Sequence, residues 1–340
     1  MWPLTNTELA RIAREQIRRR LAVLELRWSF FYSLIWPISW FIVSFQFNHR
    51  SSLGSSGPAF LLLAGALLVG SAPVKALTVT PSVDANAMAI ALLGPGVSLV
   101  PGSAVYTGAS NSSGFFAGDT TIFGDLAGAK GVLLTSGAVT NALPPNDFPN
   151  ASQDNGLLGS ADLDAIVGGD TLDASVLSFK VKLDPGTSGI QWKYSFGSEE
   201  YLEYVGTRFN DVFGLFLNGV NLALLPDGST PVSINSVNDA LNSSYYRDNP
   251  LSVGDYGTQY DGLTVVLASV ATGLDPEVEH LLSFQIADRD DRILDSGVFI
   301  QGKSIRDPDD VPTPLPMLGM ISALASSRKL RRRVALAKLR

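Results

Sequence analysis

The side chains with the clearest chemical potential in this 340-residue chain are carboxylates in two short stretches, each following a predicted strand. Oxygen-rich loops of this kind suit Ca²⁺, a hard cation that takes six to eight oxygen ligands. The spacing lets several carboxylates turn toward one point, although the EF-hand pattern is not present. The candidate calcium ligands are Glu199, Glu200, Glu203, Asp211, Asp288, Asp290, Asp291 and Asp295.

Two simpler interpretations compete with a calcium site. The carboxylates could form a solvated surface on an acidic domain, or they could pair with the guanidinium groups of Arg208, Arg289 and Arg292. A bound calcium ion would instead neutralise local repulsion and stiffen the loops, and it would therefore stabilise the fold.

Paired carboxylates also serve glycoside hydrolysis. Glu199 with Glu203, or Glu200 with Asp288, are conceivable pairs, so a secreted carbohydrate-active hydrolase is the alternative function. The residues that a cysteine or serine nucleophile would need are not found: the chain has no cysteine and no Gly-x-Ser-x-Gly motif. His280 opens a predicted strand and reads as structural, and zinc is not expected. We therefore expect a non-catalytic protein.

Six tyrosines lie in or beside predicted loops. Exposed tyrosines next to Asn and Asp would suit stacking on sugars, whereas tyrosines packed under long loops would be structural. We favour packing. The residues are Tyr201, Tyr204, Tyr245, Tyr246, Tyr256 and Tyr260.

Charge divides the chain into three parts. Residues 77–310 carry 10 Lys/Arg against 29 Asp/Glu, hence a net charge of −19, whereas both flanks are basic. Such an acidic body repels phosphate backbones, so we expect no nucleic-acid partner. Basic ends beside apolar runs are typical of segments held at the cytoplasmic face of a membrane.

The N-terminal flank contains the pattern of a secretory leader. An apolar run over 58–72 is followed by small residues at Val74 and Ala76, which predicts cleavage before Leu77. A second apolar run, 28–47, is long enough to span a bilayer and conflicts with simple export. Either residues 1 to about 50 arise from a start codon assigned too far upstream, or the protein is permanently tethered to the membrane.

The C-terminal flank combines Pro312, Thr313 and Pro314, a short apolar stretch, and a basic cluster that includes Arg331, Arg332 and Arg333. This tail resembles the PEP-CTERM sorting signal, with Thr313 in place of the family's Glu. The resemblance implies an exosortase-type sorting enzyme as partner and transient anchoring in the inner membrane. An interfacial basic helix is the alternative interpretation.

The elements that must position the acidic residues are short strands. Residues 177–183 and 190–196 alternate apolar with polar side chains, and the turn between them predicts a hairpin. A short helix is expected over 84–93, and long loops over 107–128 and 140–160. Further strands are predicted over 97–106, 131–135, 212–217, 220–225, 231–237, 263–270, 280–287 and 297–303.

The predicted class is therefore all-β, a β-sandwich or jelly-roll-like domain with long loops and a short N-terminal helix, flanked by a helical leader and tail. We expect three parts. They are an N-terminal extension with a signal peptide over 1–76, one β domain over 77–306, and a linker with a sorting tail over 307–340.

The central region resembles the choice-of-anchor L domain family over nearly all of 84–303. The resemblance is carried by Phe196–Gly206, Phe209–Leu217, Ile234–Asn238, Tyr260–Thr264 and Ile286–Asp288. It implies an exported bacterial surface domain that occurs with interchangeable C-terminal anchors. We expect a protein of the cell surface, outer membrane or extracellular matrix, with exopolysaccharide or another surface component as its partner.

Overall fold

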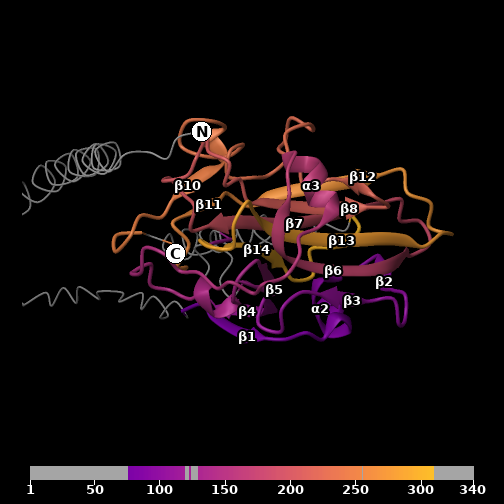
Figure 1. Ribbon diagram of the computed structural model, residues 1–340. Helices are drawn as coiled ribbons and strands as arrows, with labels where there is room; N and C mark the ends of the chain where they lie inside the picture. Colours follow the sequence, from indigo (N-terminus) through magenta and orange to yellow (C-terminus); the bar gives the residue numbers. More distant parts are fainter. Residues whose placement is uncertain (1–75, 119–121, 124–128, 255, 310–340) are drawn as a thin grey trace, which may run out of the picture. The chain divides into compact units, whose positions relative to one another are not determined.

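The computed structural model describes residues 76–118, 122–123, 129–254 and 256–309. Within these residues, eight strands form one antiparallel sheet and six form a second (Figure 1). The first contains, in spatial order, β1 (Thr78–Pro81), β4 (Ser113–Gly118), β5 (Ala129–Thr135), β14 (Ser296–Gln301), β7 (Gly189–Ser198), β11 (Gly262–Thr264) and β10 (Tyr246–Asp248), with β12 (Leu267–Thr272) also paired to β7. The second contains β2 (Val97–Leu99), β6 (Thr171–Leu183), β13 (His280–Arg289), β8 (Val212–Leu217) and β9 (Val220–Asn221), with β3 (Val105–Thr107) also paired to β6.

The two sheets share one apolar core. Alternate residues of β6, such as Phe179, and of β7, such as Trp192, are fully buried because successive side chains of a strand point to opposite faces. Tyr194 of β7 contacts Phe213 of β8 across the core, with ring centroids 4.9 Å apart. The expected all-β class is confirmed, whereas the expected leader and tail lie outside the described residues.

Short helices cover parts of the sheets. The predicted helix over 84–93 is confirmed as α2 (Ala85–Leu92), and the Asp84 carboxylate caps it by accepting from the Ala87 amide at 2.9 Å. A helix that sequence patterning missed, α3 (Ala161–Val167), packs on the outer face of the second sheet through Leu163. The 3₁₀ turns are η1 (Val139–Ala142) and η2 (Ser243–Tyr245).

The predicted hairpin between 177–183 and 190–196 is wrong. β6 pairs with β13, β2 and β3, whereas β7 pairs with β14, β11 and β12, so the turn between them carries the chain from one sheet to the other. Alternation shows that each strand has one buried face, but it does not show which strand supplies the hydrogen bonds. Both strands bury their apolar faces in the same core from opposite sides.

One loop prediction and one strand prediction also change. The expected loop over 107–128 contains β4, whose Phe116 stacks on Phe123. The strand expected over 231–237 is reduced to isolated bridges at Pro231 and Ser233. A cluster of Ser and Asn in that segment bonds its own backbone, as in the Ser236 hydroxyl to Pro231 carbonyl contact, and this competes with ladder pairing.

A buried acidic cluster at one end of the sheets

Four strand ends bring acidic residues together. β7 ends at Ser198 and β14 begins at Ser296, which are paired, and the Glu199 amide donates to the Asp295 carbonyl at 3.1 Å. In the other sheet, Ala287 of β13 pairs with Val212 of β8, which places Asp288 beside Asp211. Because both sheets end here, acids that are far apart in sequence meet at one end of the core.

Five of the predicted ligands are buried, which excludes the solvated-surface interpretation for them. Glu199 is 2 % exposed and Asp288 is 0 % exposed. The buried members are Glu199, Glu200, Asp211, Asp288 and Asp295, and we refer to these five as the acidic cluster.

The other three predicted ligands lie differently. Glu203 and Asp290 are exposed and Asp291 is half-buried. Asp290 forms ion pairs with Arg208 at 3.6 Å and Arg289 at 3.5 Å, so the salt-bridge interpretation describes Asp290.

An extended segment, residues 151–157, closes over the acidic cluster and is called the covering segment. Its alternate backbone amides all donate to carboxylates: Ala151 to Glu199 at 3.3 Å, Gln153 to Asp295 at 3.0 Å, and Asn155 to Asp173 at 2.8 Å. The period of two matches an extended backbone, which presents every second amide to the same side. A stretch expected to be a surface loop thus solvates buried charge.

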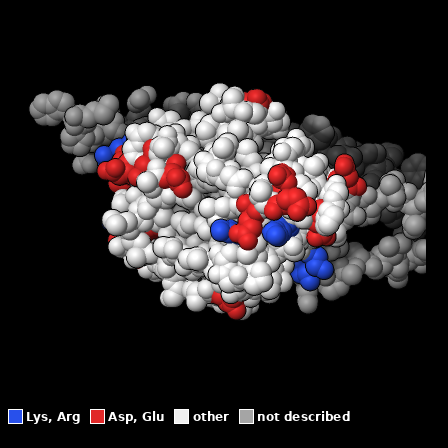
Figure 2. Space-filling model, turned by 90° about the vertical axis from the view of Figure 1, so that its right-hand side faces the viewer, with Lys and Arg blue, Asp and Glu red and all other residues white. Residues whose placement is uncertain are grey.

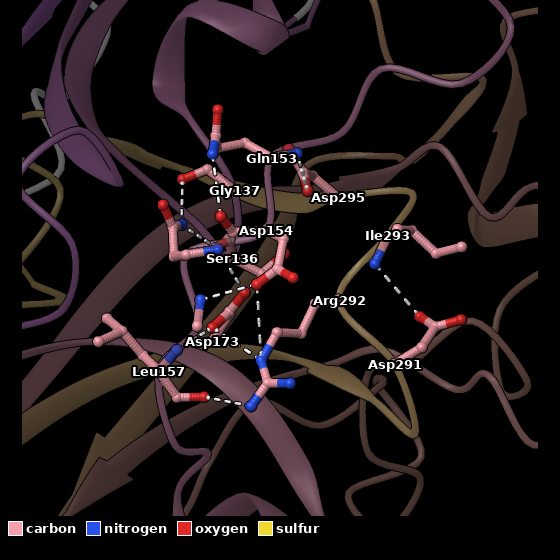
Figure 3. A network of polar contacts seen from close by, with 12 residues as sticks. Ser136, Gly137, Gln153, Asp154, Leu157, Asp173, Asp291, Arg292, Ile293 and Asp295 are labelled. Atoms are coloured by element: carbon pink, nitrogen blue, oxygen red, sulfur yellow. Dashed lines mark hydrogen bonds and ion pairs between the residues drawn. The ribbon is translucent and has the colours of Figure 1, made fainter.

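Asp173 is the acidic residue that sequence reasoning missed. It occupies a bulge of β6 with φ of 51°, where the register against β13 shifts, and its carboxylate accepts from the Asn155 and Leu157 amides. Arg292 lies 3.3 Å from Asp173 and donates to the Leu157 carbonyl (Figure 3). The available signal was that Asp173 is the one acidic residue within the β6 sequence.

The carboxylate oxygens of the acidic cluster that the covering segment does not reach have fewer hydrogen-bond partners. Asp211 accepts from the Ser296 hydroxyl at 2.7 Å and the Arg289 amide at 3.0 Å. Both carboxylate oxygens of Asp288 lack a hydrogen-bond partner, as do one oxygen of Glu199 and one of Glu200. Buried polar groups are nearly always bonded, so this part of the cluster is incomplete.

Burial and mutual repulsion shift the acids toward their protonated forms. Burial, followed by the charges of Asp211 and Asp295, holds the pKa of Asp288 well above its usual range, although the nearby Ser136 hydroxyl lowers it. Burial and the charge of Asp261 raise the pKa of Glu199 to about 9. Burial raises the pKa of Asp295 to about 6, against the lowering effect of the Gln153 amide.

The chemistry open to the acidic cluster is binding of a proton or a hard cation. Its donors are carboxylate oxygens, which Ca²⁺ prefers. Within the part of the chain that the structure describes, no three His, Asp or Glu side chains converge on one point as metal ligands would. A bound ion would therefore require side chains such as Asp288 to turn toward it.

The tyrosines expected near loops are divided. Tyr201 and Tyr260 are buried, and the Tyr201 hydroxyl donates to the Val237 carbonyl at 2.8 Å, which agrees with packing. The other four are partly exposed. His280 opens β13 and contacts the Asp275 carbonyl at 2.9 Å, as a structural residue would.

The predicted processing signals cannot be followed in the structure. Val74, Pro312, Thr313, Pro314 and the basic residues Arg331, Arg332 and Arg333 all lie outside the described residues, and Ala76 is the first described position. Among the residues that are described, no helix has the length and apolar character needed to cross a bilayer.

Two facing antiparallel sheets with a buried acidic end define a β-rich domain that encloses five of the eight predicted acidic ligands. Comparison with protein families gives a match to the choice-of-anchor L domain over residues 84–306. The chain belongs to the choice-of-anchor L domain family, and this membership indicates a surface-anchored protein of the cell surface or the extracellular space. No curated protein and no solved structure matches the chain.

Proposed function

We propose that this protein is an exported, non-catalytic surface domain whose fold is completed by a calcium ion at the acidic cluster. The observation that carries the proposal is Asp288, which is fully buried, has no hydrogen-bond partner for either carboxylate oxygen, and faces Asp211 and Asp295. A buried charge without a partner costs roughly several kcal/mol unless a bound proton or cation neutralises it. A divalent cation neutralises more than one carboxylate at once.

The composition of the acidic cluster favours calcium over other metals. The guanidinium group of Arg292 is already paired with Asp173 and with the Leu157 carbonyl, so it does not neutralise Asp288. The donors are hard oxygens, and extracellular modules bind Ca²⁺ with dissociation constants on the order of 10⁻⁴–10⁻³ M. An exported domain would therefore take up the ion after it leaves the cell.

The burial of these carboxylates also argues against the hydrolase alternative. A glycosidase must offer both carboxyl groups to a sugar, yet Glu200 is 1 % exposed and Asp288 is 0 % exposed. In the other pair considered, Glu199 is enclosed and Glu203 faces solvent. We therefore propose a structural, non-catalytic role for these acids.

The flanks and the surface complete the proposed function. We propose that a signal peptidase cleaves after Ala76 and that an exosortase-type enzyme processes the PEP-CTERM-like tail. The exposed partner would be an exopolysaccharide. Nucleic acid is disfavoured because Asp and Glu outnumber Lys and Arg, as the face in Figure 2 illustrates.

The calcium proposal is tested by thermal unfolding of the full chain with Ca²⁺ or with EDTA. We expect Ca²⁺ to raise the wild-type Tm by about 5–10 °C at saturating concentration. Asp288→Asn should keep its fold, melt in EDTA at or above the wild-type temperature because the amide is neutral without having to bind a proton, and gain less than about 2 °C from Ca²⁺.

Asp170→Asn is the matched control, because Asp170 is an exposed acid. It should respond to Ca²⁺ as the wild type does. An unchanged wild-type Tm in Ca²⁺ and EDTA, or a full calcium response in Asp288→Asn, would contradict the proposal.

A further inference from the structure

A groove of about 400 Å³ lies on the outer face of the second sheet, away from the shared core. Its floor is formed by outward-facing residues of β6, β13 and β8, and Gly159, Ser160 and Asp162 line it at the start of α3. In cross-strand register, Ser178 of β6 lies opposite Ser283, which lies opposite Phe216. Small side chains at Ser178 and Ser283 leave the centre of the floor hollow.

A connected row of polar groups runs along the groove. The Ser178 and Ser283 hydroxyls are 2.8 Å apart, and the Gln285 side-chain amide donates to the Ser283 hydroxyl at 3.0 Å and to the Asp162 carboxylate at 2.8 Å. The Ser160 hydroxyl donates to the side-chain amide oxygen of Gln285. These contacts hold the donors and acceptors in place and leave further bonding capacity at each hydroxyl and at the carboxylate.

Apolar surface lies beside this polar row. Leu281 is 43 % exposed, Phe216 keeps 7 % of its surface open, and Val176 is half-buried. Gly214 lies opposite Gln285 in the ladder and adds no side chain to the floor. A surface with apolar patches and convergent hydroxyl, amide and carboxylate groups matches a ligand that has both C–H faces and hydroxyl groups.

The charge of the residues that line the groove favours a neutral ligand over an anionic one. Its described lining residues include one carboxylate, Asp162, and no Lys, Arg or His. An anionic sugar would meet repulsion without a cation to pair with, whereas a neutral sugar can donate hydroxyl protons to Asp162. We propose that this groove binds a neutral sugar unit of a polysaccharide. The inference deepens the proposed function, because it rests on a polysaccharide partner and assigns its place.

The test is calorimetric titration of the full chain, with calcium present, in a detergent without a sugar headgroup. The probes are neutral hexasaccharides of glucose, mannose and galactose, with oligoguluronate as the anionic comparison. We expect at least one neutral hexasaccharide to bind. Ser178→Gln, which fills the hollow, should weaken that binding at least about tenfold, and Asp162→Asn should weaken it several-fold.

Ser98→Gln is the matched control, because Ser98 is exposed on β2 of the same sheet but does not line the groove. It should bind as the wild type does, and the melting temperature of each variant verifies its fold. Preference for oligoguluronate, absence of binding to every neutral probe, or wild-type affinity in folded Ser178→Gln would overturn the assignment. A wild type stabilised by calcium that binds no neutral probe would overturn the groove alone.

Discussion

Asp173 and Asp288 are almost equally inaccessible, yet their surroundings differ. Asp173 accepts two backbone amides and pairs with Arg292, whereas neither oxygen of Asp288 is bonded. The cost of a buried carboxylate depends on its partners rather than on its depth. Asp288, not Asp173, is therefore the position at which a proton or a cation is needed.

Gly137 also serves the acidic cluster, because a methyl group there would overlap the Asp295 carboxylate. We expect Gly137→Ala to lower the stability by about 2 kcal/mol, as overpacked sites commonly do. In an Asp295→Ala background the same substitution should cost less than about 0.5 kcal/mol, because the overlapping group is absent. Thermal unfolding of the four proteins of this cycle gives the coupling. Additive losses would show that the overlap does not limit Gly137.

At the scale of elements, the covering segment joins the loops around the acidic cluster. Its amides bind Glu199, Asp295 and Asp173, and the Ser152 hydroxyl accepts from the Leu294 amide at 3.1 Å. The segment contributes backbone polarity rather than apolar area, so it holds its position only while those carboxylates are placed to accept. The order of the covering segment therefore depends on the positions of the carboxylates in and beside the acidic cluster.

We expect Asp173→Asn to loosen the covering segment. The substitution keeps the shape but removes the charge that binds Arg292 and two amides, which should cost about 2–4 kcal/mol. Hydrogen exchange should accelerate at the amides of Asn155 and Leu157 while β13 stays protected. Asp170→Asn should change neither stability nor exchange. Unaltered exchange at Asn155 in the Asp173→Asn variant would contradict this role.

At the scale of the whole molecule, the raised pKa values predict an unusual pH dependence in EDTA. Glu199 keeps its proton in the folded chain up to a pKa of about 9, raised by burial and then by Asp261 and Asp295 and lowered by the Ala151 amide and Gln259. The unfolded chain releases this proton near pH 4.5, so between these values the folded state binds more protons and stability falls as pH rises.

The expected size of this effect is measurable. From pH 5 to pH 7, Glu199 alone should remove about 3 kcal/mol of stability in EDTA. Calcium should reverse the trend, because the ion binds ionised carboxylates and displaces protons. Melting curves of wild type and Glu199→Gln across pH 5–8 test this, and the variant should show a smaller fall. Higher stability at pH 8 than at pH 5 in EDTA would contradict the prediction.

Much of this organisation can be read from local pattern. Alternating side chains located β6 and β7, strands were also expected where β8 and β13 lie, and the short helix expected over 84–93 is α2. The family motifs identified the domain that the comparison confirms over 84–306. These features depend on residues a few positions apart, for which propensity and periodicity are sufficient.

Tertiary structure decided the rest. Whether β6 pairs with β7 or with β13, and whether Asp288 faces solvent or the core end, depends on segments more than a hundred residues away. The same acidic sequence after two strands is compatible with a solvated surface, with ion pairs or with an enclosed cluster. The sequence by itself determined the long strands of the domain and most of the acids that follow them. Only the packing of the two sheets, with the covering segment laid across their ends, determined that five of those acids are withdrawn from water.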